Sequence, residues 1–181
     1  MGALQATSLL IRNNCDIMLH INVDVPKNVP AYDHIRAFED TCREHNVPYE
    51  LHLDVTGDSY QDIYAQMRSI FSNIDARYPD KKKGVFLSND TYANMFLNLI
   101  FQKYGCLPDT YELIGFDNSP IAGEAILPIT TIGQQIDVIA HTAMELLVQQ
   151  MEERKKRKPR PLTAPIHKQI APVLVRRDTT G

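Results

Sequence analysis

The stretch ELIGFDN, Glu112 to Asn118, decides the fold class. After Glu112 comes the run LIGF, which has no polar side chain. The stretch ends with the carboxylate of Asp117 and the amide of Asn118. A short apolar run without polar alternation is typical of a strand buried on both faces, as in the middle of a parallel sheet. We therefore expect a strand from Glu112 to Phe116, with polar side chains at its carboxyl end.

Similar short runs occur on both sides of this stretch and alternate with longer amphipathic segments. In the longer segments apolar residues recur at steps of three and four, as on one face of a helix, and Ser59 precedes one of them as an N-cap would. This alternation predicts the α/β class, with a doubly wound parallel sheet. The expected strands are Asp16 to Val23, Tyr49 to Val55, Gly84 to Ser88, Glu112 to Phe116, Ile129 to Ile132 and Val173 to Arg176. The expected helices are about Ala31 to His45, Tyr60 to Ile74, Tyr92 to Ile100 and Ile136 to Met151. We interpret their apolar stripes as packing faces.

The composition excludes several protein classes. A composition of 44% hydrophobic and 23% charged residues is ordinary for a soluble globular protein. Its longest apolar-rich stretches, Ile17 to Val25 and Val138 to Val148, fall short of the ~20 residues that a membrane span needs. No secretory segment opens the chain. The three cysteines, Cys15, Cys42 and Cys106, fit no metal or redox spacing, so we expect reduced thiols in a cytoplasmic protein.

The charge balance argues against nucleic-acid binding by this chain. A net charge of −3 and a pI near 6.0 lack the basic footprint of a DNA-binding domain. The exception is the basic run at residues 154–160. Because Lys and Arg are favoured at helix C-termini, we interpret this run as the end of the last helix.

Ligands of open α/β sheets bind outside the carboxyl ends of the strands. Carboxylates, amides and hydroxyls there can bind the hydroxyls of a small polar molecule. Two of the candidates have ordinary alternatives, since Asp90 could N-cap a helix that begins near Thr91 and Asp117 to Pro120 fits a β-turn. The polar residues expected at strand ends are Asn22, Thr56, Ser88, Asn89, Asp90, Asp117 and Asn118.

Catalytic motifs are missing from the sequence. It contains no phosphate-binding glycine loop, no nucleophile elbow and no paired metal-ligand spacing. Its six histidines are scattered, and we interpret His20 and His52, inside expected strands, as satisfied core or surface residues. We therefore expect no enzyme activity, no cofactor and no metal.

Four segments together resemble the lactose/galactose repressor family of bacterial transcription regulators. Residues 112–118 and PITTI, 128–132, resemble the family's V-I-G-F-D-D and P-x-L-T-T-I motifs. Residues 85–93, VFLSNDTYA, resemble A-I-x-A-x-N-D-x-x-A, and residues 172–180, PVLVRRDTT, resemble the closing P-x-L-V-V-R-E-S-T. Gly2 to Ile21 resembles the helix and strand that open the family's second effector lobe.

The resemblance implies a periplasmic-binding-protein-like (type I) effector lobe. Residues 1–132 correspond to the second lobe, 133–158 to a helix that in the family packs with the first lobe, and 159–181 to a C-terminal loop and strand. The family's helix-turn-helix and most of the first lobe have no counterpart here, so any DNA contact is expected only through such a domain. A lobe without its partner exposes apolar surface, so we expect a homo-oligomer and no membrane contact.

Family effectors are mostly sugars, and the resemblance implies which residues would bind one. Asp117 is the expected anchor, since a carboxylate can accept hydrogen bonds from two hydroxyls. Asn89, Gln134 and Asp90 are the supporting candidates. One position departs from the family. Family members usually have an arginine four residues before an aromatic residue, and here His34 lies in that position before Phe38. Arg36 would fit only with a register shift. Both remain candidates for contacting the effector.

Three functions stay open on the sequence. The first is an effector-sensing domain of a repressor, in which ligand binding moves two lobes and changes DNA affinity. The second is a periplasmic-type sugar-binding protein of a transporter, which would share the fold and the pocket. The third is an enzyme of flavodoxin-like or Rossmann type, against which stands the missing phosphate loop. Fold alone does not separate them.

Overall fold

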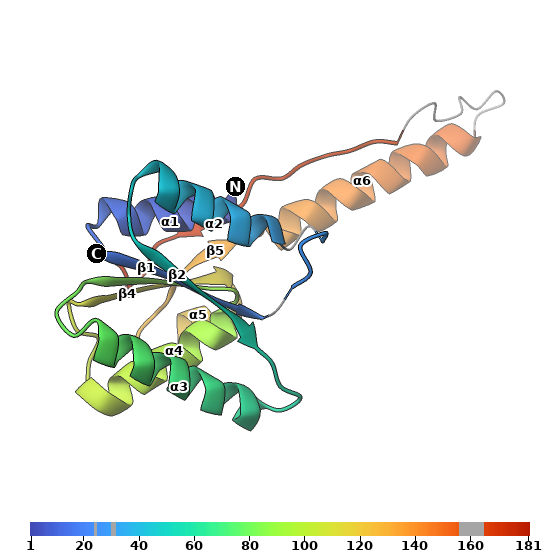
Figure 1. Ribbon diagram of the computed structural model, residues 1–181. Coiled ribbons are helices and arrows are strands. Elements are labelled where there is room, and N and C mark those ends of the chain that lie inside the picture. The colour runs from blue at the N-terminus through green and yellow to red at the C-terminus, as the bar shows by residue number, and fades with distance from the viewer. Residues whose placement is uncertain (24, 30–31, 156–164) are drawn as a thin grey trace.

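The computed structural model describes residues 1–23, 25–29, 32–155 and 165–181, and it shows one twisted sheet with helices on both faces (Figure 1). The strands are β1 (Ile17–Val23), β2 (Tyr49–Val55), β3 (Lys83–Leu87), β4 (Tyr111–Asp117), β5 (Thr130–Gly133) and β6 (Val173–Val175). The helices are α1 (Gly2–Arg12), α2 (Tyr32–Glu44), α3 (Tyr60–Arg77), α4 (Asp90–Tyr104), α5 (Pro120–Glu124) and α6 (Ile136–Lys155).

The sheet order is β2-β1-β3-β4-β5-β6. The first five strands are parallel, which confirms the doubly wound α/β prediction, while β6 pairs with β5 in the antiparallel direction. The prediction of a parallel sheet is therefore wrong for the last strand. From β1 the chain adds β2 on one side of the sheet and then β3 on the other side. The boundary between β1 and β3 is therefore the switch point at which such sheets form their ligand crevice.

Two apolar layers hold the helices on the sheet. On one face, α1 and α2 pack through residues such as Leu10 and Phe38. On the other, α3, α4 and α5 pack through residues such as Phe71, Phe96 and Ala122. Figure 1 shows the two helical layers above and below the strands.

Local capping explains where α3 begins and where α4 begins and ends. Ser59 caps α3, and its Oγ accepts a hydrogen bond from Asp62 N at 3.2 Å, as the sequence predicts. Gly105 ends α4 with φ +73°, a left-handed conformation that glycine adopts without strain. The cap of α4 is Asn89, so the alternative in which Asp90 caps this helix is wrong by one residue.

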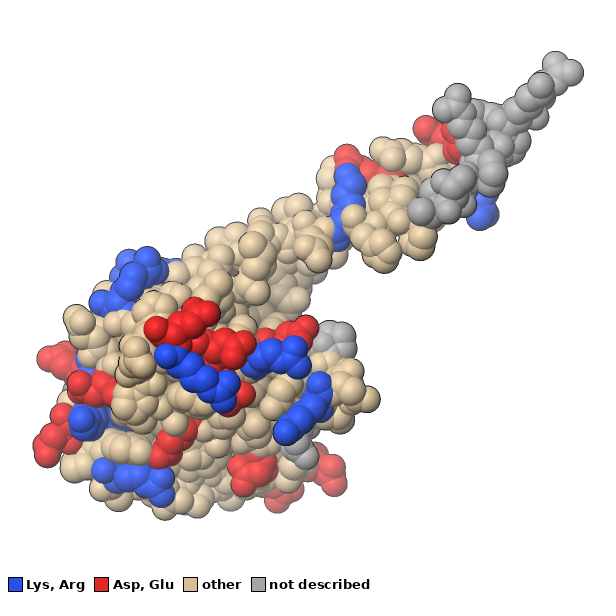
Figure 2. Space-filling model, turned by 45° about the horizontal axis from the view of Figure 1, so that its top comes forward, with Lys and Arg blue, Asp and Glu red and all other residues tan. Residues whose placement is uncertain are grey.

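Helix α6 leaves the body and projects as an arm (Figures 1 and 2). None of its residues is buried, and Met144 and Leu147 are 58% and 50% exposed. No described element covers its apolar stripe, as expected for a helix that lacks its usual neighbours, and the role of the stripe as a packing face stays a prediction. Arg154 and Lys155 end the helix, and the rest of the basic run lies outside the described residues.

Among the described residues, no helix is both long and apolar enough to cross a membrane. Across the same residues, no group of three or more His, Cys, Asp and Glu side chains could hold a metal ion. The three cysteines are free thiols, as expected, and only Cys106 is exposed.

Candidate ligand-binding site

The carboxyl ends of β4 and β5 bring two of the predicted site residues into contact. Because Asp117 pairs with Gly133 in the sheet, the next residue, Gln134, lies beside its carboxylate. Gln134 Nε2 donates a hydrogen bond to Asp117 Oδ1 at 2.6 Å. Asp117 is half-buried, so its carboxylate is held at the sheet edge while it stays accessible to a ligand.

The backbone at this edge adopts unusual conformations. Asp117, Asn118 and Gln135 have φ values of +100°, +52° and +50°, in the region that residues other than glycine rarely adopt. Such strained positions persist only where the surrounding structure holds them, and they cluster at ligand sites. Their concentration at the ends of β4 and β5 therefore marks this edge as a candidate site.

His34 reaches the same edge from α2. Its ring lies 4.8 Å from the ring of Phe116, the residue before Asp117. Burial lowers the pKa of His34, and so does the charge of the amino terminus, while the carboxylates of Asp33 and Asp117 act in the opposite direction. His34 is therefore a largely neutral ring at neutral pH, placed next to the Asp117 carboxylate.

Arg36 lies elsewhere on α2. Its side chain is 62% exposed and pairs with Asp33 at 4.0 Å. An exposed pair of this kind contributes little to stability. Of the two candidates for the position of the family's arginine, the structure brings His34 to the strand ends, and it leaves Arg36 in solvent.

Asn89 is both a site candidate and a helix cap. Its Oδ1 accepts a hydrogen bond from Tyr92 N at 2.8 Å, which satisfies one of the free N–H groups at the start of α4. Among the described residues, its amide nitrogen has no protein partner, and the side chain is half-buried. The cap therefore fixes the oxygen and leaves an N–H donor for a ligand.

Asp90, in contrast, uses its carboxylate inside the protein. The residue is 1% exposed, and it accepts hydrogen bonds from Ser119 N at 2.7 Å, Ser119 Oγ at 3.0 Å and Thr131 Oγ1 at 2.6 Å. Burial raises its pKa, and these bonds offset part of that rise. Gly115 makes the arrangement possible, because a Cβ there would collide with the Asp90 carboxylate. Asp90 ties α4 to the ends of β4 and β5, which is a positioning role.

The remaining predicted strand-end residues have different surroundings. Asn22 is 7% exposed, and its Oδ1 accepts from Val23 N at 2.8 Å. Thr56 follows the edge strand β2, and its backbone N–H donates to Gln66 Oε1 at 3.0 Å. Asn118 accepts at Oδ1 from Arg177 Nη2 at 2.7 Å, a contact between distant parts of the sequence that the sequence analysis missed.

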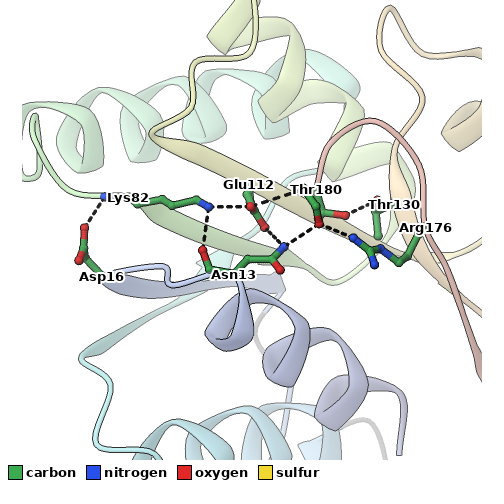
Figure 3. A network of polar contacts seen from close by, with 8 residues as sticks. Asn13, Asp16, Lys82, Glu112, Thr130, Arg176 and Thr180 are labelled. Atoms are coloured by element: carbon green, nitrogen blue, oxygen red, sulfur yellow. Dashed lines mark hydrogen bonds and ion pairs between the residues drawn. The ribbon is translucent and has the colours of Figure 1, made fainter.

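A second polar network lies at the opposite, amino end of the strands (Figure 3). Lys82 Nζ contacts Glu112 Oε1 at 2.8 Å and donates to Asn13 O at 2.8 Å. Asn13 Nδ2 donates to Glu112 Oε2 at 2.7 Å and to Gly181 O at 3.1 Å. The network fixes the C-terminal segment against the sheet, and this segment supplies Arg177 to the candidate site.

The comparisons with known proteins agree with this geometry. A model of the periplasmic binding protein-like domain matches residues 10–180. The ribose operon repressor of Halalkalibacterium halodurans is 26% identical over 155 residues, which cover 84% of this chain and 44% of the repressor. The transcriptional repressor PurR of Aliivibrio fischeri is 23% identical over 153 residues, with the same two shares. The chain thus spans less than half the length of these relatives.

Solved structures show the same fold. A ribose operon repressor protein from Lactobacillus acidophilus superposes with a TM-score of 0.73 at 20% identity, over 99% of this chain and 61% of that one. A LacI family regulator from Enterococcus faecium with bound ribose gives a TM-score of 0.72 at 19% identity, over 99% and 62% of the two chains. At these identities the superpositions establish the fold.

Proposed function

The chain belongs to the periplasmic binding protein-like domain family, and from this premise we propose that it is the effector-binding part of a bacterial transcription repressor. The curated relatives named above are repressors, which favours regulation over the transporter alternative. Catalysis has no support among the described residues, since the carboxylate and the imidazole at the strand ends have no nucleophile aligned with them.

The proposed effector is a small polyhydroxylated molecule, a sugar. The observation that carries this proposal is the Asp117 carboxylate, fixed by Gln134 at 2.6 Å and flanked by the His34 ring over Phe116. A carboxylate accepts hydrogen bonds from two hydroxyls at once, and flat rings pack against the apolar faces of a sugar. Asn89 adds an N–H donor to this set, and Asp90 holds the elements in place.

Signal transfer would follow from lobe movement. A ligand that binds better to a closed cleft shifts the protein toward that state by hinge closure, and an attached helix-turn-helix then gains or loses affinity for its operator. Residues 1–132 would be one lobe, with 133–158 as the helix that joins the other lobe and 159–181 as the returning segment. The exposed apolar stripe of α6 supports this division, because such a stripe is stable when another element covers it.

We also propose that the chain assembles as a homo-oligomer. A shallow groove between α3 and α4 is lined by Tyr60, Tyr64, Phe101 and Ile126. Tyr60 and Ile126 are 55% and 63% exposed, and the two tyrosine rings stack at 5.9 Å. Light scattering at tens of micromolar tests this assembly, and a monomer at that concentration would refute it.

The test of function is a titration of the 15N-labelled chain with D-ribose, cellobiose and sucrose, followed by NMR. We expect one of these sugars to shift the amide signals of Asn89, Asp117 and Gln134 in a saturable way. A parallel mobility-shift assay should show no sequence-specific DNA binding by this chain, whose net charge is −3. If no sugar shifts any signal up to tens of millimolar, the proposal is wrong.

A further inference from the structure

Two buried polar atoms on the β1 and β3 side of β4, the strand that ends in Asp117, have no hydrogen-bond partner among the described residues. They are Nε2 of His20, in β1, and Oγ of Ser88, which directly follows β3. His20 is 0% exposed. A buried acceptor or donor without a partner costs about 1–3 kcal/mol, so native proteins almost always supply one. We therefore expect each of these atoms to have a hydrogen-bond partner other than the described side chains.

The two residues belong to one row on the α2 face of the sheet. His20 lies opposite Phe86 in the β1–β3 pairing, and side chains two residues apart in a strand point to the same face. On this face, Ser88 is therefore the next side chain after Phe86 toward the carboxyl ends of the strands, and Asn22 is the next after His20. Ser88 N donates to Ile21 O at 3.0 Å, so the pairing extends to this end of the row.

A series of ring contacts connects His20 with the candidate site. The ring centroids of His20 and Phe86 are 4.8 Å apart, those of Phe86 and Phe116 are 6.4 Å apart, and those of Phe116 and His34 are 4.8 Å apart. The unpartnered Nε2 therefore lies in the same layer as the residues that flank Asp117.

The tautomer of His20 follows from its one hydrogen bond. Nδ1 lies 3.0 Å from Phe86 O, and a carbonyl can only accept, so Nδ1 carries the proton and donates. Burial keeps the ring neutral, because it lowers the pKa to about 4. In a neutral ring with its proton on Nδ1, Nε2 is a hydrogen-bond acceptor. The partner that it calls for is a donor such as a hydroxyl group.

We propose that His20 and Ser88 form the inner wall of the ligand site, where His20 Nε2 accepts a hydrogen bond from one ligand hydroxyl and Ser88 Oγ binds a neighbouring one. This inference rests on the proposed sugar-binding function and makes it more specific. An anionic group at the inner wall would face the lone pair of Nε2, so the site selects a neutral polyol over a sugar phosphate. The ligand then spans the edge from Asp117 to the row that contains Asn22.

The test compares D-ribose binding by the 15N-labelled chain and three variants. His20→Phe keeps a ring between Phe38 and Phe86 but removes the acceptor, and Ser88→Ala removes the hydroxyl. We expect each to weaken ribose binding about three- to tenfold, the loss of one neutral hydrogen bond. His52→Phe, in the edge strand β2, is the matched control and should leave the affinity unchanged.

A second measurement does not depend on how the variants fold. In the unsubstituted chain, the 15N signal of His20 Nε2 should move when ribose saturates the site. A stationary signal, or unchanged ribose affinity in both folded variants, would show that the row holds internal water only and would overturn this inference while leaving sugar binding intact. If ribose, cellobiose and sucrose all fail to bind the unsubstituted chain, the proposed function itself fails, and this inference fails with it.

Discussion

Acidification should destabilise the fold through His20, and the size of the effect follows from the ring's burial. In the folded chain the ring is fully buried between Phe38 and Phe86, and burial lowers its pKa from 6.5 to about 4. In the unfolded chain the ring titrates near its ordinary value. Between these two pKa values the unfolded state binds a proton that the folded state does not, so the free energy of unfolding falls as the pH falls.

The expected magnitude is large for a single residue. Well above pH 6.5 both states are neutral at this ring, and its contribution is constant. From pH 7 to pH 5 the expected loss is about 2 kcal/mol, and by pH 4 it is about 3 kcal/mol, at 1.36 kcal/mol for each unit of pKa difference. Since domains of this size are stable by about 5–15 kcal/mol, the loss is readily measured.

Urea unfolding followed by circular dichroism at pH 7, 6 and 5 provides the assay. Other groups also titrate in this range, and Asp90, whose pKa is raised by burial, acts in the opposite direction. The informative quantity is therefore the difference between the unsubstituted chain and His20→Phe. We expect the variant to lose about 2 kcal/mol less between pH 7 and pH 5. Equal pH dependence in the two proteins would refute the reasoning.

Three further predictions follow from the site and its surroundings. Asp117→Asn should weaken sugar binding about ten- to a hundredfold in a calorimetric titration. The melting temperature should not fall, because asparagine tolerates the positive φ and can still accept the hydrogen bond from Gln134. Unchanged affinity with a lower melting temperature would make Asp117 structural. Asp90→Ala should cost about 3 kcal/mol in urea unfolding, since it leaves three hydrogen-bond donors without their acceptor; a loss below about 1 kcal/mol would contradict its positioning role. A thiol reagent should label Cys106 alone in the native chain, because Cys15 and Cys42 are buried with pKa values raised to about 12, and rapid labelling of a second thiol would count against this packing.

Local patterns predicted most of the fold because apolar periodicity and caps act over a few residues. Every expected strand is present within one or two residues of its predicted ends, and Ser59 caps α3. Local patterns are insufficient where the answer depends on a distant partner. The stripe of α6 has the spacing of a buried face, yet the spacing does not reveal which element covers it. The direction of β6 likewise depends on its pairing with β5.

The site shows the same division between local and distant information. Asp117 was predicted from its place after a strand, Gln134 was implied by the family resemblance, and the sheet register joins them. The contacts that support the site were not predicted, because their partners are far apart in the sequence. Asp90 and Thr131 are separated by 41 residues, and Asn118 and Arg177 by 59. No local pattern indicates such pairs.

The choice between His34 and Arg36 could have been made from the sequence. Residues four apart lie on one face of a helix, while residues two apart lie about 200° around it. Phe38 is the large apolar residue of this helix and must face the core, so His34, four residues earlier, shares its face, and Arg36 points away. The structure has this arrangement, with Phe38 fully buried, His34 over Phe116 and Arg36 in solvent. The largest buried residue of a helix therefore shows which face of the helix packs inward and which of its neighbours can reach a ligand. Arg36 lies on the opposite face, so its closeness in sequence to His34 does not let it take the role of His34.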